Sequence, residues 1–194
     1  MATRPAAAQP EPTDEALVDA LNRGDAHAFE RLYNRHREWV WRVAVRYLGD
    51  ESEAWDVVQV VFMDFLKRFP GFRLTSRLTT YLYPVTRHFA YALARKRKRA
   101  AVGLDDSAPL PARAGPEIER DERLARLSQA LALLPAIHAE VLLMRYVDDM
   151  SMEEIGAALG VPPGTVKSRL HHALAKLQAD PDARGYFSSS DQNQ

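Results

Sequence analysis

Apolar residues recur every three or four positions along most of the chain, which is the spacing of an amphipathic α-helix. The pattern predicts an all-α fold, and Gly and Pro residues mark the breaks between its helices. In the helix expected at 135–146, Ile137 and Tyr146 fall on the face predicted to be buried. The predicted helices span residues 14–21, 26–48, 52–69, 85–99, 120–134, 135–146, 151–159 and 163–177.

The stretch Ser151–Leu177 carries the signals of a helix-turn-helix. Ser151 and Glu154 have the S-x-x-E spacing of a capping box, which favours a helix start. Gly156 leaves room for a second helix to cross closely, and Gly160 can take the positive φ that ends the first helix. The Pro-Pro pair that follows suits the first turn of a new helix, where a missing N–H costs little.

The second of these two helices has two chemically different faces. Its inner stripe is apolar, whereas its outer face and flanks carry hydroxyls and cations, at Thr165, Lys167, Ser168, Arg169, His172 and Lys176. Such a helix suits the major groove of duplex DNA, where these groups reach base edges and phosphates. A plain helical hairpin with a solvated face is the alternative, and the combination of cap, small residues and turn argues against it.

Formal net charge is zero for the whole chain, but the charge is unevenly distributed. Residues 27–100 hold fifteen Lys and Arg against seven Asp and Glu, whereas residues 128–180 hold four against six. The basic part ends in five consecutive cations, Arg95–Arg99. Because these cations continue an amphipathic helix, we interpret them as a phosphate-binding cluster rather than as a solvated tail.

Basic and aromatic residues also lie side by side in residues 72–83, where Arg73 and Arg77 accompany Tyr81 and Tyr83. Rings can stack on unpaired bases while cations meet phosphates, so this mixture favours single-stranded nucleic acid. Ordinary packing of aromatic side chains between helices is the alternative.

The helical pattern stops at a Pro- and Gly-rich segment, residues 101–119, which predicts an extended linker. We therefore expect two small helical domains, at 14–100 and 120–179. The second should contain four helices, including the helix-turn-helix. The ends of the chain, 1–13 and 180–194, are expected to be disordered.

Composition and missing motifs exclude several classes of function. The chain has no cysteine, which excludes disulfides, thiol catalysis and Cys-ligated zinc. Neither a signal peptide nor a run of about 18 apolar residues is visible, so we expect a cytoplasmic protein without a membrane span. His171 and His172 point about 100° apart on a helix and make a poor metal pair. No catalytic motif is present, and we expect neither an enzyme nor a bound metal or cofactor.

Short strings in both halves of the chain carry a family resemblance. Residues 56–62 read DVVQVVF, which is similar to the D-V-V-Q-E-V-F segment of the sigma-70 family. Phe72-Arg73 and residues 80–83, TYLY, are similar to its F-R and T-W-L-Y segments, and residues 164–170 match its G-T-V-K-S-R-L at every position. In this order, and separated by a Pro-rich linker, the strings resemble the small two-domain extracytoplasmic-function group of these transcription initiation factors.

The resemblance implies a sigma factor that directs promoter-specific initiation by RNA polymerase, and it implies a role for individual residues. The resemblance assigns binding of core polymerase, through the β′ coiled coil, to Asp56, Val57, Gln59, Val60 and Phe62. Binding of the minus-10 DNA element falls on Arg73, Tyr81, Arg87, His88, Tyr91, Arg95, Lys96 and Arg97. Binding of the minus-35 element falls on the outer-face residues of the second helix of the helix-turn-helix, in a domain that also meets the polymerase β flap. The family further implies an anti-sigma protein as a partner.

Four residues depart from the family pattern. Val60 replaces an acidic residue in the β′-binding string, and Tyr81 replaces a Trp. His172 stands in the place of a common Arg, so its contact with DNA should be weaker and dependent on pH. Pro84 stands inside a predicted helix, where proline costs about 3 kcal/mol, so we expect a break or kink near Tyr83.

A transcriptional regulator that binds duplex DNA without polymerase is the alternative function. Such a protein would need a sensor pocket or a dimer interface, and the string at 56–62 would have no explanation.

Overall fold

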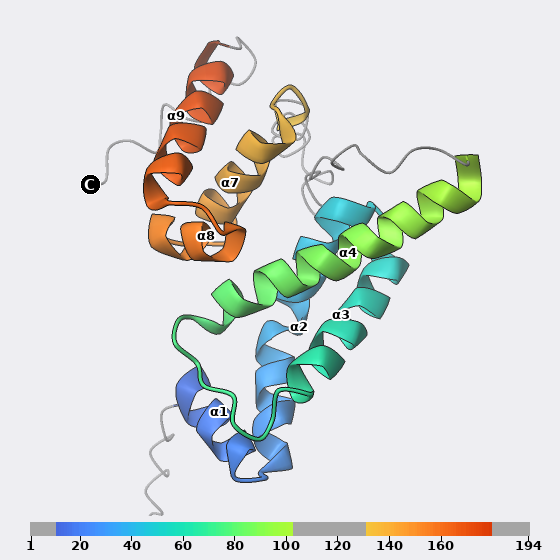
Figure 1. The fold of residues 1–194 in the computed structure, drawn as a ribbon, viewed down its shortest axis with the longest axis vertical. Helices are drawn as coiled ribbons and strands as arrows, with labels where there is room; N and C mark the ends of the chain where they lie inside the picture. The colour runs from blue at the N-terminus through green and yellow to red at the C-terminus, as the bar shows by residue number, and fades with distance from the viewer. Residues whose placement is uncertain (1–10, 103–130, 180–194) are drawn as a thin grey trace, which may run out of the picture.

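The computed structural model describes residues 11–102 and 131–179, and all the regular secondary structure within these ranges is helical, as predicted (Figure 1). No helix in these two ranges combines the length and apolar character needed to cross a membrane. Of the ends predicted to be disordered, 1–13 and 180–194, only residues 11–13 lie among the described residues, and the Thr13 side chain caps the first helix. The helices are α1 (Asp14–Asn22), α2 (Ala26–Leu48), α3 (Glu51–Leu66), α4 (Leu78–Val102), α7 (Ala136–Tyr146), α8 (Met152–Leu159) and α9 (Pro163–Ala179).

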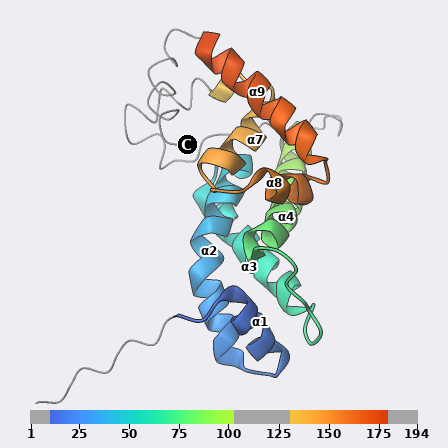
Figure 2. The ribbon, with the colours of Figure 1, turned by 90° about the vertical axis from the view of Figure 1, so that its left-hand side faces the viewer.

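α2 is the central helix of a first group, in which it packs against α1, α3 and α4 (Figures 1 and 2). Gly49 ends α2 in the left-handed conformation at φ 66°, where glycine carries no steric penalty. The Asp50 side chain then caps α3 by accepting from the N–H groups of Ser52 and Glu53. This tight corner folds α3 back along α2, and the two helices share a core that includes Leu32, Val40, Val43, Ala44, Val58, Val61 and Phe65.

α4 runs without interruption through Pro84, so the break expected near Tyr83 is wrong, whereas the kink expected there as the other possibility stays a prediction. Burial of the neighbouring residues explains why the helix persists. Leu82, Tyr83 and Thr86 are all buried, and their packing offsets a proline cost of about 3 kcal/mol. The Thr86 hydroxyl also donates to the carbonyl of Leu82 at 2.8 Å, one turn back.

α8 and α9 form the predicted helix-turn-helix. The capping box is confirmed, because Ser151 Oγ accepts from the Glu154 N–H at 3.1 Å and the Glu154 carboxylate accepts from the Ser151 N–H at 2.7 Å. Gly160 ends α8 at φ 67°. A Cβ at Gly156 would lie 2.8 Å from the Val161 carbonyl oxygen, so the corner needs glycine there. The apolar stripe of α9 is buried as expected, at Val166, Leu170, Ala173 and Leu177.

α7 completes the second group and is buried from two sides. Residues 139–144 are all buried, whereas Ile137 and Tyr146 are 46% and 55% exposed, so their predicted burial is wrong. The sequence pattern assumed that this helix buries one face. That assumption fails because α7 contacts α9 on one side and, through Glu140, the side chains of α2 and α4 on another.

The two groups meet where α8 packs against α4, and both views place α7 and α8 beside α2 and α4 (Figures 1 and 2). Of the predicted linker 101–119, only Ala101 and Val102 lie among the described residues, where they extend α4. Of the helix predicted at 120–134, residues 131–134 are described, and Leu131 and Ala132 are helical. The domain boundaries stay predictions.

Gly156→Ala should destabilise the helix-turn-helix by about 1–3 kcal/mol, because the added Cβ overlaps backbone rather than a movable side chain. Gly164→Ala is the matched control, since a Cβ there meets nothing within 4 Å and alanine favours the helix. Urea unfolding followed by circular dichroism measures both variants. Equal stability of the two would contradict the close crossing at Gly156.

Candidate nucleic-acid interface

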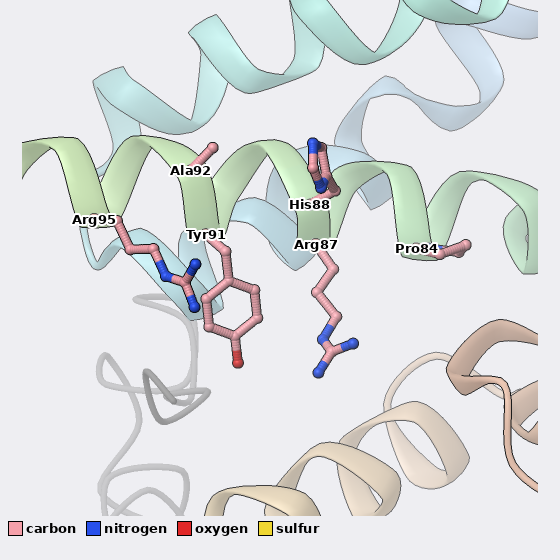
Figure 3. Close-up of a pocket in the computed structure, with 6 residues that line it drawn as sticks. All are labelled: Pro84, Arg87, His88, Tyr91, Ala92 and Arg95. Carbon is pink, nitrogen blue, oxygen red and sulfur yellow. The ribbon is translucent and has the colours of Figure 1, made fainter. Parts of the chain in front are cut away.

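One side of α4 carries a groove of about 470 Å³ that mixes cations with an aromatic ring (Figure 3). Arg87, Tyr91 and Arg95 follow one another at four-residue spacing and project from one side of α4, toward α7 (Figure 3). The Arg87 guanidinium lies 5.3 Å from the centre of the Tyr91 ring, in a cation–π contact. Pro84, His88 and Ala92 complete the lining. A ring flanked by cations suits an unstacked base and its phosphates.

α9 presents the second candidate surface. Lys167, Ser168, His172 and Lys176 are exposed, while Thr165 and Arg169 are half-buried at its edge. The His172 ring lies nearly parallel to that of His138 from α7, at 19° and 5.8 Å between ring centres. Burial, and then the charges of His172, Arg169 and Lys176, lower the pKa of His138. The sequence interpretation missed His138, which sits on a different helix.

α3 presents a third surface, of different chemistry. Asp56, Gln59 and Val60 are exposed along one face of the helix, and Trp55 and Met63 extend that face at 40% and 61% exposure. A spacing of three and four from Asp56 through Met63 could have identified Met63, which the sequence interpretation did not name. An apolar face with an acidic edge suits a protein partner rather than DNA.

Val57 and Phe62 do not belong to that face, which corrects the predicted set of polymerase contacts. They are only 3% and 2% exposed. The Phe62 ring packs edge-on to Tyr33 at 4.9 Å and to Phe29 at 6.2 Å between ring centres. They hold α3 on α2 from within, because positions 54, 57, 58, 61, 62 and 65 form its inner stripe.

Comparisons with known proteins match both groups of helices. The family model "Sigma-70 region 2" matches residues 32–100, and "Sigma-70, region 4" matches residues 124–177. The ECF RNA polymerase sigma factor SigL of Mycobacterium tuberculosis is 34% identical over 167 residues, covering 84% of this chain and 94% of SigL. This chain belongs to the extracytoplasmic-function group of the sigma-70 family. SigW of Bacillus subtilis, also an ECF sigma factor, is 24% identical over 176 residues, covering 83% of this sigma factor and 92% of SigW.

Solved structures show the same fold. CnrH, solved with the cytosolic domain of CnrY, has a TM-score of 0.63 and 25% identity, covering 86% of this chain and 95% of CnrH. RpoE from Bartonella quintana, solved with the anti-sigma factor NepR, has a TM-score of 0.59 and 26% identity, covering 78% and 94%. With region 2 and region 4 both matched, the alternative of a regulator that acts without polymerase is not favoured.

Two residues that the sequence assigned to minus-10 DNA lie in or beside the loop before α4 of this sigma factor. Arg73 is exposed in the loop. Tyr81 is half-buried, and its ring packs 4.9 Å from Phe72 and 5.8 Å from Phe65, measured between ring centres. Burial raises the pKa of the Tyr81 hydroxyl, which therefore stays protonated at neutral pH. Tyr81 belongs to an aromatic cluster with Phe65, Phe69 and Phe72, and its role toward DNA stays a prediction.

The five cations at the end of α4 are not equivalent. Successive residues of a helix point about 100° apart, so the run encircles α4 instead of forming one face. Arg97 points back onto its own group, where it donates to the Glu53 carboxylate at 3.0 Å and to the Leu48 carbonyl at 3.1 Å. Arg97 thus holds the end of α4 against the corner between α2 and α3. Lys96 and Lys98 are exposed.

Arg97→Ala should lower the free energy of unfolding by about 1 kcal/mol, because it removes two hydrogen bonds at a partly exposed site. Lys96→Ala removes the same charge from the same run but should leave stability within about 0.5 kcal/mol. Urea unfolding separates the two. If both variants are as stable as the parent, Arg97 has no structural role.

Proposed function

We propose that this sigma factor binds core RNA polymerase through the exposed face of α3 and binds promoter DNA through α4 and α9. One observation supports the proposal most directly. A single chain carries a cation–aromatic groove suited to unpaired bases and a recognition helix suited to duplex DNA. A promoter that is opened at one element and remains duplex at another requires this combination.

On α4, we assign the minus-10 element to the groove around Arg87, Tyr91 and Arg95. Cations at its edges hold phosphates, and the Tyr91 ring offers a surface on which a base can stack. Stacking contributes about 1–3 kcal/mol per base, which can offset the unpairing of a few A·T pairs. His88 and the exposed Lys96 extend the same basic surface.

On α9, we assign the minus-35 element to the face that carries Lys167, Ser168 and His172, with Thr165, Arg169 and Lys176 beside them. The capping box and the glycine corner hold α9 at a fixed angle to α8, as a helix that enters the major groove requires. Hydroxyl and cationic side chains there can reach base edges and phosphates.

On α3, we assign polymerase binding to Asp56, Gln59 and Val60, with Trp55 and Met63 as an apolar extension. Val60 in place of the family's acidic residue makes this surface more apolar. Because a sigma factor acts together with RNA polymerase, we also propose that this chain is located in the cytoplasm. CnrH and RpoE were each solved with a partner, CnrY and the anti-sigma factor NepR, and we propose that an anti-sigma protein likewise controls this chain.

The proposal is tested by transcription in vitro with core polymerase on fragments of the source genome. Discrete start sites that need the added chain are expected. If the chain does not bind core polymerase in a pull-down, the proposal is wrong.

Asp56→Arg should weaken binding to core polymerase by at least about tenfold, because it reverses an exposed charge on the proposed contact face. Asp19→Arg makes the same charge reversal on the exposed side of α1 and should leave the affinity unchanged. Fluorescence anisotropy with labelled chain measures both. Equal losses in the two variants would show that overall charge, and not the α3 face, governs the affinity.

Lys167→Ala should weaken binding to a promoter recovered from the genomic fragments. If Lys167 meets one phosphate, the slope of log K against log salt should fall by about 0.9. Lys67→Ala removes an equal charge at the exposed end of α3 and should leave the slope unchanged. An unchanged slope for Lys167→Ala would mean that this side chain makes no phosphate contact.

A further inference from the structure

Two histidine rings face each other where α7 packs against α9, and these helices lie side by side in both views (Figures 1 and 2). The ring centres of His138 on α7 and His172 on α9 are 5.8 Å apart, and the ring planes differ by 19°. The His171 ring lies 5.9 Å from that of His172, at a steeper angle of 65°. His138 is half-buried and His172 is exposed, so the pair lies at the edge of the α9 face that we assign to minus-35 DNA.

Positive side chains of α9 surround this pair. Arg169 and Lys176 lie three residues before and four residues after His172, so they share its side of the helix. Burial lowers the pKa of His138, and the charges of His172, Arg169 and Lys176 lower it further, because all three act on the same ring. Among the described residues, none of these four side chains forms an ion pair with a carboxylate.

The other charged groups on α7 and α8 are engaged elsewhere or exposed. Glu140 of α7 forms its ion pair with Arg87 of α4, at 2.9 Å. Arg145 of α7 donates to a backbone carbonyl in the turn before α8, at 3.0 Å. On α8, Glu154 closes the capping box, and Glu153 is exposed. The positive charge around the two rings therefore has no counterion in the part of the chain that the structure describes.

We propose that His138 binds DNA, and that it forms a subsite for one backbone phosphate of the minus-35 element together with His172, Arg169 and Lys176. The inference rests on the proposed function, because it extends the minus-35 surface of α9 onto α7. A phosphate accepts charge-assisted hydrogen bonds from imidazolium, guanidinium and ammonium groups, and it supplies the negative charge that the cluster lacks. A helix packed beside a recognition helix lies near the wall of the groove, where the DNA backbone runs.

Binding of a phosphate in this subsite is linked to a proton. In the free chain, the lowered pKa keeps the His138 ring neutral at pH 7. A phosphate beside the ring favours the imidazolium and raises its pKa, so formation of the DNA complex takes up a proton. Affinity for DNA therefore rises as the pH falls from the pKa of the bound ring to that of the free ring. Below both values the ring is protonated in both states, and the dependence on pH ends.

The first test compares affinities for a promoter duplex at about pH 5.5 and about pH 7.5, which lie on either side of the ordinary histidine pKa. Fluorescence anisotropy should show that the parent binds at least about fivefold more tightly at the lower pH. His138→Gln keeps a polar side chain that cannot take up a proton. It should weaken binding mainly at the lower pH, so that the ratio of the two affinities falls by at least about threefold.

Two further variants make this comparison specific. His27→Gln removes a histidine of α2 whose side chain is 91% exposed, and it should leave the ratio unchanged. His172→Gln alters the exposed partner of the pair and should lower the ratio as His138→Gln does, which keeps the test valid if His138→Gln misfolds. A histidine that only supported α9 would lower the affinity equally at both pH values.

The second test follows protonation of His138 directly, through the NMR signal of its Cε1–H. The chain has six histidines, and the signal of His138 is the one lost in His138→Gln. Addition of a random-sequence duplex should raise the pH at which His138 is half-protonated, since the subsite binds backbone and not bases. Inorganic phosphate at the same phosphate concentration should raise it less, and the midpoint of His27 should not move.

An unchanged His138 midpoint on addition of duplex would overturn the subsite, as would equal losses of affinity at both pH values in His138→Gln and His172→Gln. An equal rise of the midpoint with inorganic phosphate would overturn the assignment to DNA. If the parent chain does not bind core polymerase, the proposed function fails, and the NMR midpoints with random-sequence duplex still decide whether the subsite exists.

Discussion

Burial of charge at the end of α2 is the constraint on which the arrangement of the two helical groups depends. Removing an ion from water costs several kcal/mol, and only close pairing with an opposite charge recovers that cost. Arg46 and Asp148 satisfy each other in a site that is closed to solvent. α2 is therefore buried by α1, α3 and α4 along its apolar stripe and by the second group at its polar end. One helix thus links the core of the first group to the position of the second.

Sequence alone predicted the parts whose signals are local. The span of α2, the capping box of α8 and the glycine corner follow from residues within one or two turns of each other, and the structure confirms them. Glu140 could not be predicted in this way. Its tyrosine partners lie 93 and 57 positions away, and on a helical projection it looks like any solvated carboxylate. Ile137 and Tyr146 were misassigned for the same reason, since α7 has two covered faces.

Pro84 and Phe62 show a second limit, which is that a family pattern says where a residue lies and not which way it points. Proline lowers the local preference for helix, but packing of the residues beside it keeps α4 intact. Phe62 belongs to the same string as Gln59, yet it points into the core while Gln59 points to solvent. The candidate site stays a prediction, and the structure adds to it which side chains are exposed and which are buried.

The basic part of the chain contains fewer available cations than its composition implies. Arg46, Arg87 and Arg97 are each engaged by an acidic side chain, and two of those acids, Asp148 and Glu140, come from the second group. These acidic side chains therefore neutralise positive charge that residues 27–100 would otherwise offer to nucleic acid.

The neutral net charge of the chain affects how strongly the protein binds nonspecific DNA while it searches for promoters. A chromosome offers about 10⁶–10⁹ nonspecific sites to any exposed basic surface. The fifteen cations and seven acids of residues 27–100 would favour binding to these nonspecific sites. The second group holds four cations against five acids in residues 131–179, and it packs over part of the same surface. A factor that carries its own counterions in this way partitions less onto bulk DNA, and more of it stays free to diffuse to polymerase.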